Sequence, residues 1–221
     1  MLIDVLSAVE SSSFTAIREQ MVDTVRFLNA RGWTPATSSN FSACLPGFAD
    51  TIAISRSGVD KAAFSESDVM LIDGGGRTVW PEGVRSSAET LIHTLIYDLF
   101  APGAILHTHS LGATALSVLK GRFGKVAFQG IELLKGLSGV TTHETCIDVP
   151  IFPNDQDMER FSVSIRDRLV GDAPYGFLIE GHGLYTWGET LAEARRHVEV
   201  FEFLFEYALR MEAFNGTAHN S

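Results

Sequence analysis

The segment Ala104-Ile105-Leu106-His107-Thr108-His109 joins a short apolar run to two histidines separated by one threonine. The apolar run is typical of a buried strand. In an extended strand residues i and i+2 point to the same face, so the two imidazoles would lean toward one point, as two ligands of one metal ion must. The segment therefore predicts a strand that carries metal ligands at its carboxyl end.

A third candidate ligand follows a second apolar run. His182 lies between two glycines, directly after residues 177–179. An H-x-H pair can also be a surface pair, and a Gly-His-Gly can be an ordinary turn, but their shared position after strands favours one metal site formed by His107, His109 and His182. Three histidines leave positions open for water or substrate, which is typical of a catalytic site and not of a structural one.

Composition limits the size and the partners of the protein. A chain of 221 residues with 45% apolar content can bury one sizeable core, so we expect a single domain over 1–221. The formal net charge of −10 argues against nucleic acid as a partner, because phosphate backbones require clustered lysine and arginine. An anionic substrate would have to be held by local groups.

The chain shows no signal for secretion or for membrane insertion. Residues 1–6 carry an acid and lack a basic segment followed by a long apolar core, and no stretch approaches the length of a membrane span. We therefore expect a cytoplasmic protein without a membrane partner and with reduced cysteines. Cys44 and Cys146 lie far apart without C-x-x-C spacing, which excludes a thiolate zinc site.

Hydrophobic periodicity predicts helices that flank a group of short strands. The three glycines at 74–76 predict a hairpin turn, since no lysine-serine pair follows and no helix begins there as a phosphate loop would require. Strands grouped early and centrally, with no βαβ repeat, favour a layered α/β sandwich with a mixed or antiparallel sheet. Besides 104–109, the expected strands are 51–55, 69–73, 78–80 and 177–179, and the expected helices are 13–30, 87–99, 112–119, 131–137, 156–170 and 191–211.

Three short clusters of hydroxyls, amides and glycine suggest an anion site. They are Thr37-Ser38-Ser39-Asn40, Ser55-Arg56-Ser57-Gly58 and Arg85-Ser86-Ser87, two of them beside expected helix starts. Such positions offer backbone N–H groups and short donors to an anion, helped by the helix dipole. Each cluster alone is typical of an ordinary cap or turn. Together with three histidines, they favour a shared phosphate site.

Taken together, these motifs resemble the class II aldolase and adducin family over nearly the whole chain. The matching segments, in the order and spacing of that family, are Thr37-Ser38-Ser39-Asn40, Ser57-Gly58-Val59-Asp60-Lys61, Ser87-Ala88-Glu89-Thr90-Leu91-Ile92-His93, His107-Thr108-His109 and Gly181-His182-Gly183. The resemblance implies a three-layer α/β/α sandwich around a mainly antiparallel sheet, a homo-oligomer (commonly a tetramer with sites between subunits), and one divalent metal per subunit, with zinc as the first choice.

The resemblance also implies a small phosphorylated sugar as substrate. By position, the phosphate would be bound by Asn40, Ser57, Gly58 and Ser87. Two positions differ from the family pattern. Ser39 stands where the aldolases often have glycine, and Ala88 replaces a serine that often helps to bind phosphate, which could shift the contact toward Ser86 or Arg85.

Two further segments, 130–136 and 150–157, resemble a branch of the family whose members are dehydratases of methionine salvage. That branch converts 5-methylthioribulose 1-phosphate to 2,3-diketo-5-methylthiopentyl 1-phosphate and water. The resemblance implies Glu132 as the first candidate for the catalytic acid/base and Glu89 as the second. Taken without it, Glu132 is typical of a solvated helix residue and Glu89 of a capping-box acid that reaches back from Ser86.

Two other functions remain open from the sequence. A sugar-phosphate aldolase or 4-epimerase would use the same metal site, because fold and metal alone do not determine the reaction. A non-catalytic adducin-like module would keep the fold without the metal, and the intact set of three histidines argues against it.

Overall fold

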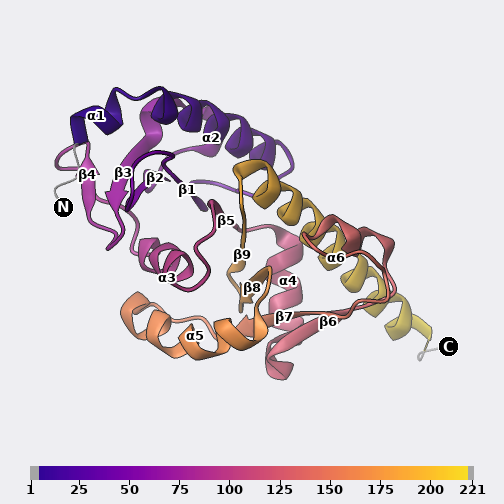
Figure 1. The fold of residues 1–221 in the computed structure, drawn as a ribbon. Coiled ribbons are helices and arrows are strands. Elements are labelled where there is room, and N and C mark those ends of the chain that lie inside the picture. Colours follow the sequence, from indigo (N-terminus) through magenta and orange to yellow (C-terminus); the bar gives the residue numbers. More distant parts are fainter. Residues whose placement is uncertain (1–4, 219–221) are drawn as a thin grey trace.

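The computed structural model describes residues 5–218 and shows one large sheet covered by helices (Figure 1). The expectation of a cytoplasmic protein rests partly on residues 1–4, which lie outside that range. Within 5–218, no helix is both long enough and apolar enough to cross a membrane.

Nine strands form the sheet in the order β4-β3-β2-β1-β5-β9-β8-β7-β6. Seven of the neighbouring pairs are antiparallel, and β7 with β8 is the parallel one, which confirms a mainly antiparallel sheet. The strands are β1 (Asn40–Cys44), β2 (Thr51–Ser55), β3 (Val69–Asp73), β4 (Thr78–Trp80), β5 (Ala104–Thr108), β6 (Lys125–Phe128), β7 (Ile147–Phe152), β8 (Gly176–Ile179) and β9 (Gly183–Gly188).

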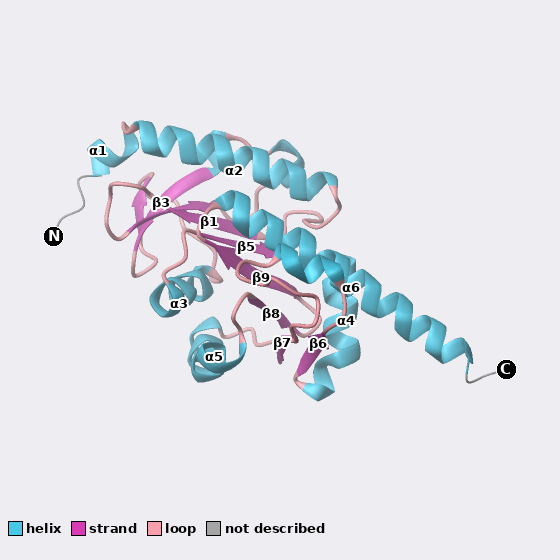
Figure 2. Ribbon diagram, turned by 45° about the vertical axis from the view of Figure 1, so that its right-hand side comes forward, coloured by secondary structure: helices cyan, strands magenta, loops and turns pink. Residues whose placement is uncertain are grey.

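Helices cover both faces of this sheet, which confirms the three-layer α/β/α sandwich. Figure 2 shows α2 (Ser12–Ala30) and α6 (Leu191–Ala218) above the sheet, with α3 (Thr90–Phe100) and α5 (Met158–Asp172) below it. α4 (Leu111–Lys120) packs against α6, and the short α1 (Val5–Val9) against α2. Alternate residues of β5 supply both cores. Leu106 packs with α2 and α6, whereas Ile105 packs with α3 and α5.

The strand β5 lies in the middle of the sheet, and this position places the first histidine in the interior. β5 pairs with β1 on one side and with β9 on the other, so His107 is opposite Asn40 and Tyr185. All five residues of β5 are buried. A strand with neighbours on both edges and helices on both faces is a rigid base for a binding site.

Most expected elements appear in the structure with small shifts of their ends. The strands 51–55, 69–73 and 78–80 have the expected bounds, and the glycines at 74–76 form the turn between β3 and β4. The helix expected from residue 87 begins at Thr90, because Ser87 and Glu89 form the turn that precedes it. The last helix continues to Ala218, beyond the expected end at residue 211.

One expectation about local structure was wrong, and four strands were missed. Residues 131–137 do not form an α-helix but a short 3-10 helix, η4 (Glu132–Gly136), with i→i+3 bonds from Leu134 to Ile131 and from Leu137 to Leu134. The remaining 3-10 turns are η1 (Lys61–Ala63), η2 (Glu66–Asp68) and η3 (Gly121–Phe123). The strands β1, β6, β7 and β9 were not expected. β1 alternates the polar residues Asn40 and Ser42 with apolar ones, and β9 begins and ends with glycine.

Candidate metal centre

Three histidines and one glutamate converge beside the carboxyl end of β5. One ligand atom from each of Glu89, His107, His109 and His182 lies within 4.8 Å of the others. The Nε2 atoms of His107 and His109 are 2.7 Å apart, and Glu89 Oε1 lies 3.0 Å from His182 Nε2 and 3.8 Å from His107 Nε2. The three predicted histidines thus form one cluster, and Glu89 joins it.

Backbone contacts orient the ring of His107 and anchor the backbone of His109. His107 Nδ1 donates to the carbonyl oxygen of Leu184 at 2.8 Å, which leaves Nε2 free to face the cluster. The ring of His107 also stacks on Tyr185, with centroids 3.9 Å apart. The backbone N–H of His109 donates to the carbonyl of Trp33 at 2.9 Å. These contacts hold the first two ligands before any ion binds.

The two glycines beside His182 have different roles. Gly181 has a positive φ of +65° and makes the turn from β8 to β9. Gly183 permits a close approach of strands, because a Cβ there would lie 2.0 Å from the carbonyl oxygen of Thr108. The carbonyl of His182 accepts a hydrogen bond from Thr114 Oγ1 at 3.0 Å. The third ligand is therefore held against the end of β5.

The protonation states in the cluster suit a divalent cation. Burial lowers the pKa of His107 well below its usual value and lowers the pKa of His109 to about 4, so both rings are neutral near pH 7. Burial alone would raise the pKa of Glu89, but the hydrogen bond with His182 and the nearby imidazoles lower it to about 2. These two neutral imidazoles and the carboxylate, together with the ring of His182, form a donor set that zinc and similar ions accept.

A cavity of about 230 Å³ opens directly beside this cluster. All of the residues predicted to bind phosphate line it, together with Glu89 and His109 from the cluster. They are Asn40, Ser57, Gly58 and Ser87. The structure thus brings the phosphate candidates and the metal candidates to one cavity, although the role of each residue remains a prediction.

Ser39 in the same cavity has two unusual features. Its φ is +74°, in the left-handed region that favours glycine, the residue that the resemblance implied for this position. Its buried hydroxyl has no hydrogen-bond partner among residues 5–218. A strained residue with an unsatisfied donor at a cavity wall fits a site that holds an oxyanion.

A buried lysine joins two of the cavity loops. Lys61 Nζ donates to the carbonyls of Val59 at 2.9 Å and of Thr37 at 3.4 Å. Its side chain is fully buried, and burial lowers its pKa. The bonds tie the 37–40 loop to the turn at Ser57 and Gly58. Sequence reasoning gave Lys61 no role, because nothing in a single lysine predicts burial.

Glu132 lies elsewhere in this chain. It belongs to η4, is 71% exposed, and pairs with Lys135 and with His143 at 3.6 Å. It is not among the groups that meet at the metal cluster and does not line the cavity beside it. Its role as acid/base stays a prediction.

Sequence reasoning missed a second layer of polar residues behind Glu89. Asn40 Nδ2 donates to Glu89 Oε2, and Asn40 Oδ1 contacts His93 Nε2. Ser42 Oγ lies 2.7 Å from His93 Nδ1 and 2.9 Å from the hydroxyl of Tyr97. The signal was present in two spacings, with polar residues at i and i+2 in 40–42 and at i, i+4 and i+8 from Glu89.

Comparison with known proteins agrees with this geometry. The profile described as "Class II Aldolase and Adducin N-terminal domain" matches residues 19–209. The chain belongs to the class II aldolase and adducin family. Among solved structures, an L-fuculose-1-phosphate aldolase of Thermus thermophilus superposes with a TM-score of 0.72, covering 92% of this chain and 98% of that one. At 23% identity, this likeness shows the fold alone.

Two curated relatives are much more similar in sequence. A protein of Stenotrophomonas maltophilia (strain K279a) is 47% identical over 201 residues, which cover 90% of this chain and 93% of its own. A protein of Picosynechococcus sp. (strain ATCC 27264 / PCC 7002 / PR-6) is 48% identical over 198 residues, covering 87% and 91%. Both are named methylthioribulose-1-phosphate dehydratase. The expected dehydratase branch therefore agrees with these relatives.

Proposed function

We propose that the protein is a hydro-lyase that converts 5-methylthioribulose 1-phosphate to 2,3-diketo-5-methylthiopentyl 1-phosphate and water, a step of methionine salvage. The observation that carries the proposal is the cavity shared by the metal cluster and the phosphate candidates, in a chain 47% identical to a named dehydratase. The proposal includes a cytoplasmic location.

The proposed cofactor is one divalent metal per chain, with zinc as the first choice. His107, His109 and His182 would hold it, with Glu89 as a fourth ligand or as a close counter-charge. A metal bound there supplies Lewis-acid polarisation of the substrate C2 ketone, which acidifies the hydrogen on C3. Because three imidazoles also suit iron, cobalt and nickel, metal analysis of the purified protein has to identify the ion.

The chain's own residues would hold the rest of the substrate. The phosphate would lie among Asn40, Ser57, Gly58 and Ser87, and the unsatisfied hydroxyl of Ser39 adds a fifth donor at the same wall. The side chains among these donors are uncharged, so the binding relies on hydrogen bonds and on the buried ammonium of Lys61 behind the loops. A phosphate bound there would leave the ketone of the sugar facing the histidines.

Dehydration then needs two proton transfers. A base removes the hydrogen from C3, and an acid protonates the hydroxyl that leaves C4, after which the enol tautomerises to the diketone. We propose Glu132 for this work and Glu89 as the alternative. Since Glu132 is 71% exposed and does not line the cavity of its own chain, we propose that it enters the site of a neighbouring copy in a homotetramer.

Hybrid oligomers test the assignment of Glu132 to a neighbouring site. Co-expression of His109→Ala with Glu132→Gln, each with its own tag, gives mixed oligomers whose parents are both inactive. If Glu132 acts across subunits, random mixing leaves about one quarter of the sites with an intact metal cluster and an intact glutamate. Activity near that fraction supports the proposal. If Glu132 acts within its own chain, no intact site forms and the hybrids stay inactive.

Product analysis tests the function itself. The metal-loaded protein should release the diketone from 5-methylthioribulose 1-phosphate without breaking a carbon–carbon bond. Formation of two smaller carbonyl fragments would identify an aldolase, and inversion at C4 without loss of water would identify an epimerase. A His109→Ala protein serves as the control for reactions that do not depend on the cluster.

A further inference from the structure

The strand β1 and the helix α3 face each other with matching repeats. Along β1, Asn40 and Ser42 point to the same side, about 6.8 Å apart for a two-residue step. On the other side, Glu89 directly precedes α3 with helical backbone angles, and His93 and Tyr97 follow it at steps of four residues, about 6 Å per step. Because the spacing along the strand and the spacing along the helix are nearly equal, each strand side chain contacts two successive residues of the helix side. Asn40 contacts Glu89 and His93, and Ser42 contacts His93 and Tyr97.

These five residues form an unbroken series of hydrogen bonds, called here the β1–α3 ladder. It runs from Glu89 to Asn40, then to His93, to Ser42 and to Tyr97. Asn40 and Ser42 are buried, and His93 has no exposed surface. The ladder begins at the metal cluster and passes through the interior between the sheet and the helix layer.

The hydrogens of the ladder can point in one direction only. A carboxylate accepts but does not donate, so the Asn40 amide must turn its NH₂ toward Glu89 and its oxygen toward His93. His93 Nε2 must then carry the hydrogen, and Nδ1 must accept one from the hydroxyl of Ser42. The oxygen of Ser42 in turn accepts from Tyr97. Every donor therefore points toward Glu89, an arrangement in which successive bonds polarise one another.

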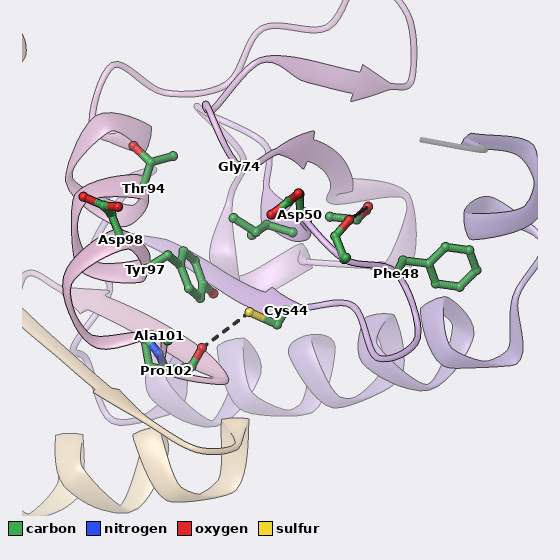
Figure 3. A pocket seen from close by; sticks show the side chains of 12 residues that line it. Cys44, Phe48, Asp50, Gly74, Thr94, Tyr97, Asp98, Ala101 and Pro102 are labelled. Atoms are coloured by element: carbon green, nitrogen blue, oxygen red, sulfur yellow. Dashed lines mark hydrogen bonds between the residues drawn. The ribbon is translucent and has the colours of Figure 1, made fainter. Parts of the chain in front are cut away.

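The far end of the ladder reaches a separate cavity of about 380 Å³. Figure 3 shows Tyr97 on the wall of this cavity beside Cys44, whose thiol donates to the carbonyl of Pro102 at 3.4 Å. Neither His93 nor Ser42 lines the cavity with the phosphate candidates, and neither belongs to the metal cluster. The ladder thus connects these two residues to the site through Asn40 and Glu89. His93 also packs edge-on against Tyr185, which stacks on His107, so the test has to separate the hydrogen-bonded route from this packing route.

We propose that His93 and Ser42 are positioning residues that fix the Asn40 amide, so that it holds one carboxylate oxygen of Glu89 while the other faces the histidines. The inference deepens the proposed function, since it concerns the same metal centre. Its test measures metal affinity, however, and so does not depend on dehydratase activity.

Two single variants and their combination with Glu89→Gln carry the test. Affinity for Zn²⁺ is measured by competition with a chelator in the parent, in the single variants His93→Leu, Ser42→Ala and Glu89→Gln, and in the two double variants. Residues that orient ligands typically affect affinity by about 10–100-fold. We expect His93→Leu to fall in that range, Ser42→Ala to lose less, and neither to weaken binding further once Glu89 is glutamine, because the carboxylate they position is then absent.

Further variants separate positioning from general packing. His93→Gln keeps one donor and one acceptor and should recover most of the affinity that His93→Leu loses. Tyr97→Phe removes only the terminal hydroxyl and should change affinity least. Thermal unfolding identifies variants that fail to fold, and Ser42→Ala, the smallest change, remains informative if His93→Leu does so.

Three results would overturn the proposal. They are unchanged affinity in Glu89→Gln, a loss in His93→Leu that persists at full size in the Glu89→Gln background, and a loss that follows the drop in melting temperature and not the order of positions along the ladder. Because Zn²⁺ binding is measured without substrate, a protein that makes no diketone can still confirm or overturn the ladder.

Discussion

Replacing Gly183 with alanine should damage both the fold and the metal centre. A Cβ at this position would lie 2.0 Å from the carbonyl oxygen of Thr108 and 3.3 Å from Cε1 of His107. Carbon and oxygen normally approach to about 3.3 Å, so the backbones of β5 and β9 must separate by roughly 1.3 Å. Gly183 also pairs with Ile179 of β8, and its neighbour Leu184 pairs with Thr108 of β5, so neither strand can move alone.

The expected loss follows from that separation. Overpacking costs typically about 1–3 kcal/mol, and a clash with paired backbone belongs at the upper end. For a domain of this size, about 3 kcal/mol corresponds to a drop of roughly 6–12 °C in melting temperature. A displacement of about 1 Å at a reacting site can also cost about 100-fold in rate. Thermal unfolding measures the loss of stability, turnover measures the loss of rate, and chelator competition for Zn²⁺ measures the damage to the metal centre.

Gly171 offers the matched control. It lies in α5 with no atom within 4 Å of the position a Cβ would take and without a positive φ. Gly171→Ala should leave metal affinity unchanged and leave the melting temperature unchanged or slightly higher, because alanine favours a helix. A Gly183→Ala protein that melts like the parent and binds Zn²⁺ equally well would refute the argument about the close approach of β5 and β9.

The site leads to four other predictions. His109→Ala should lose most bound metal while keeping the fold, as metal analysis and circular dichroism would show; full metal content would exclude the assignment of this ligand. Ser57→Asp should raise KM for the phosphorylated substrate sharply by charge repulsion, and an unchanged KM would mean that the phosphate binds elsewhere. Glu132→Gln should lower kcat by roughly 10²–10⁴ with metal retained, and Glu89→Gln should be milder; the reverse order would transfer the acid/base role to Glu89. Burial lowers the pKa of His93 from 6.5 to about 4, so folding opposes its protonation. Its contribution to stability is therefore present above pH 6.5 and is lost as pH falls from 6.5 to 4, by about 3 kcal/mol. The free energy of unfolding should vary less with pH in His93→Gln than in the parent, and equal slopes in the two proteins would contradict this.

Local patterns predicted the elements that are regular in themselves. Strands such as 51–55 and 69–73 are short apolar runs bounded by turns, and their bounds were found correctly. β1 was missed because it carries polar side chains on a strand, Asn40 and Ser42, that only their partners on α3 make reasonable. Burial of polar groups depends on residues about 50 positions away in the chain, which periodicity cannot detect.

The residues of the site also fall into those that local sequence patterns could predict and those that they could not. The three histidines could be predicted because strand geometry relates two of them directly, and glycines mark the third. The burial of Lys61 could not, since it depends on how two loops meet. Nor could the exposed position of Glu132, because the resemblance supplied its role but not its distance from the metal cluster.

The central place of β5 has a consequence for how such a protein can diverge. Two of the candidate metal ligands belong to a fully buried inner strand of the sheet or follow it directly, whereas the groups proposed for the phosphate come from separate loops and helix starts. Loops tolerate substitution and changes of length far better than a paired inner strand does. Substrate preference can therefore be altered step by step in the loops while the metal chemistry is inherited intact, which makes the fold a durable starting point for new sugar-phosphate enzymes.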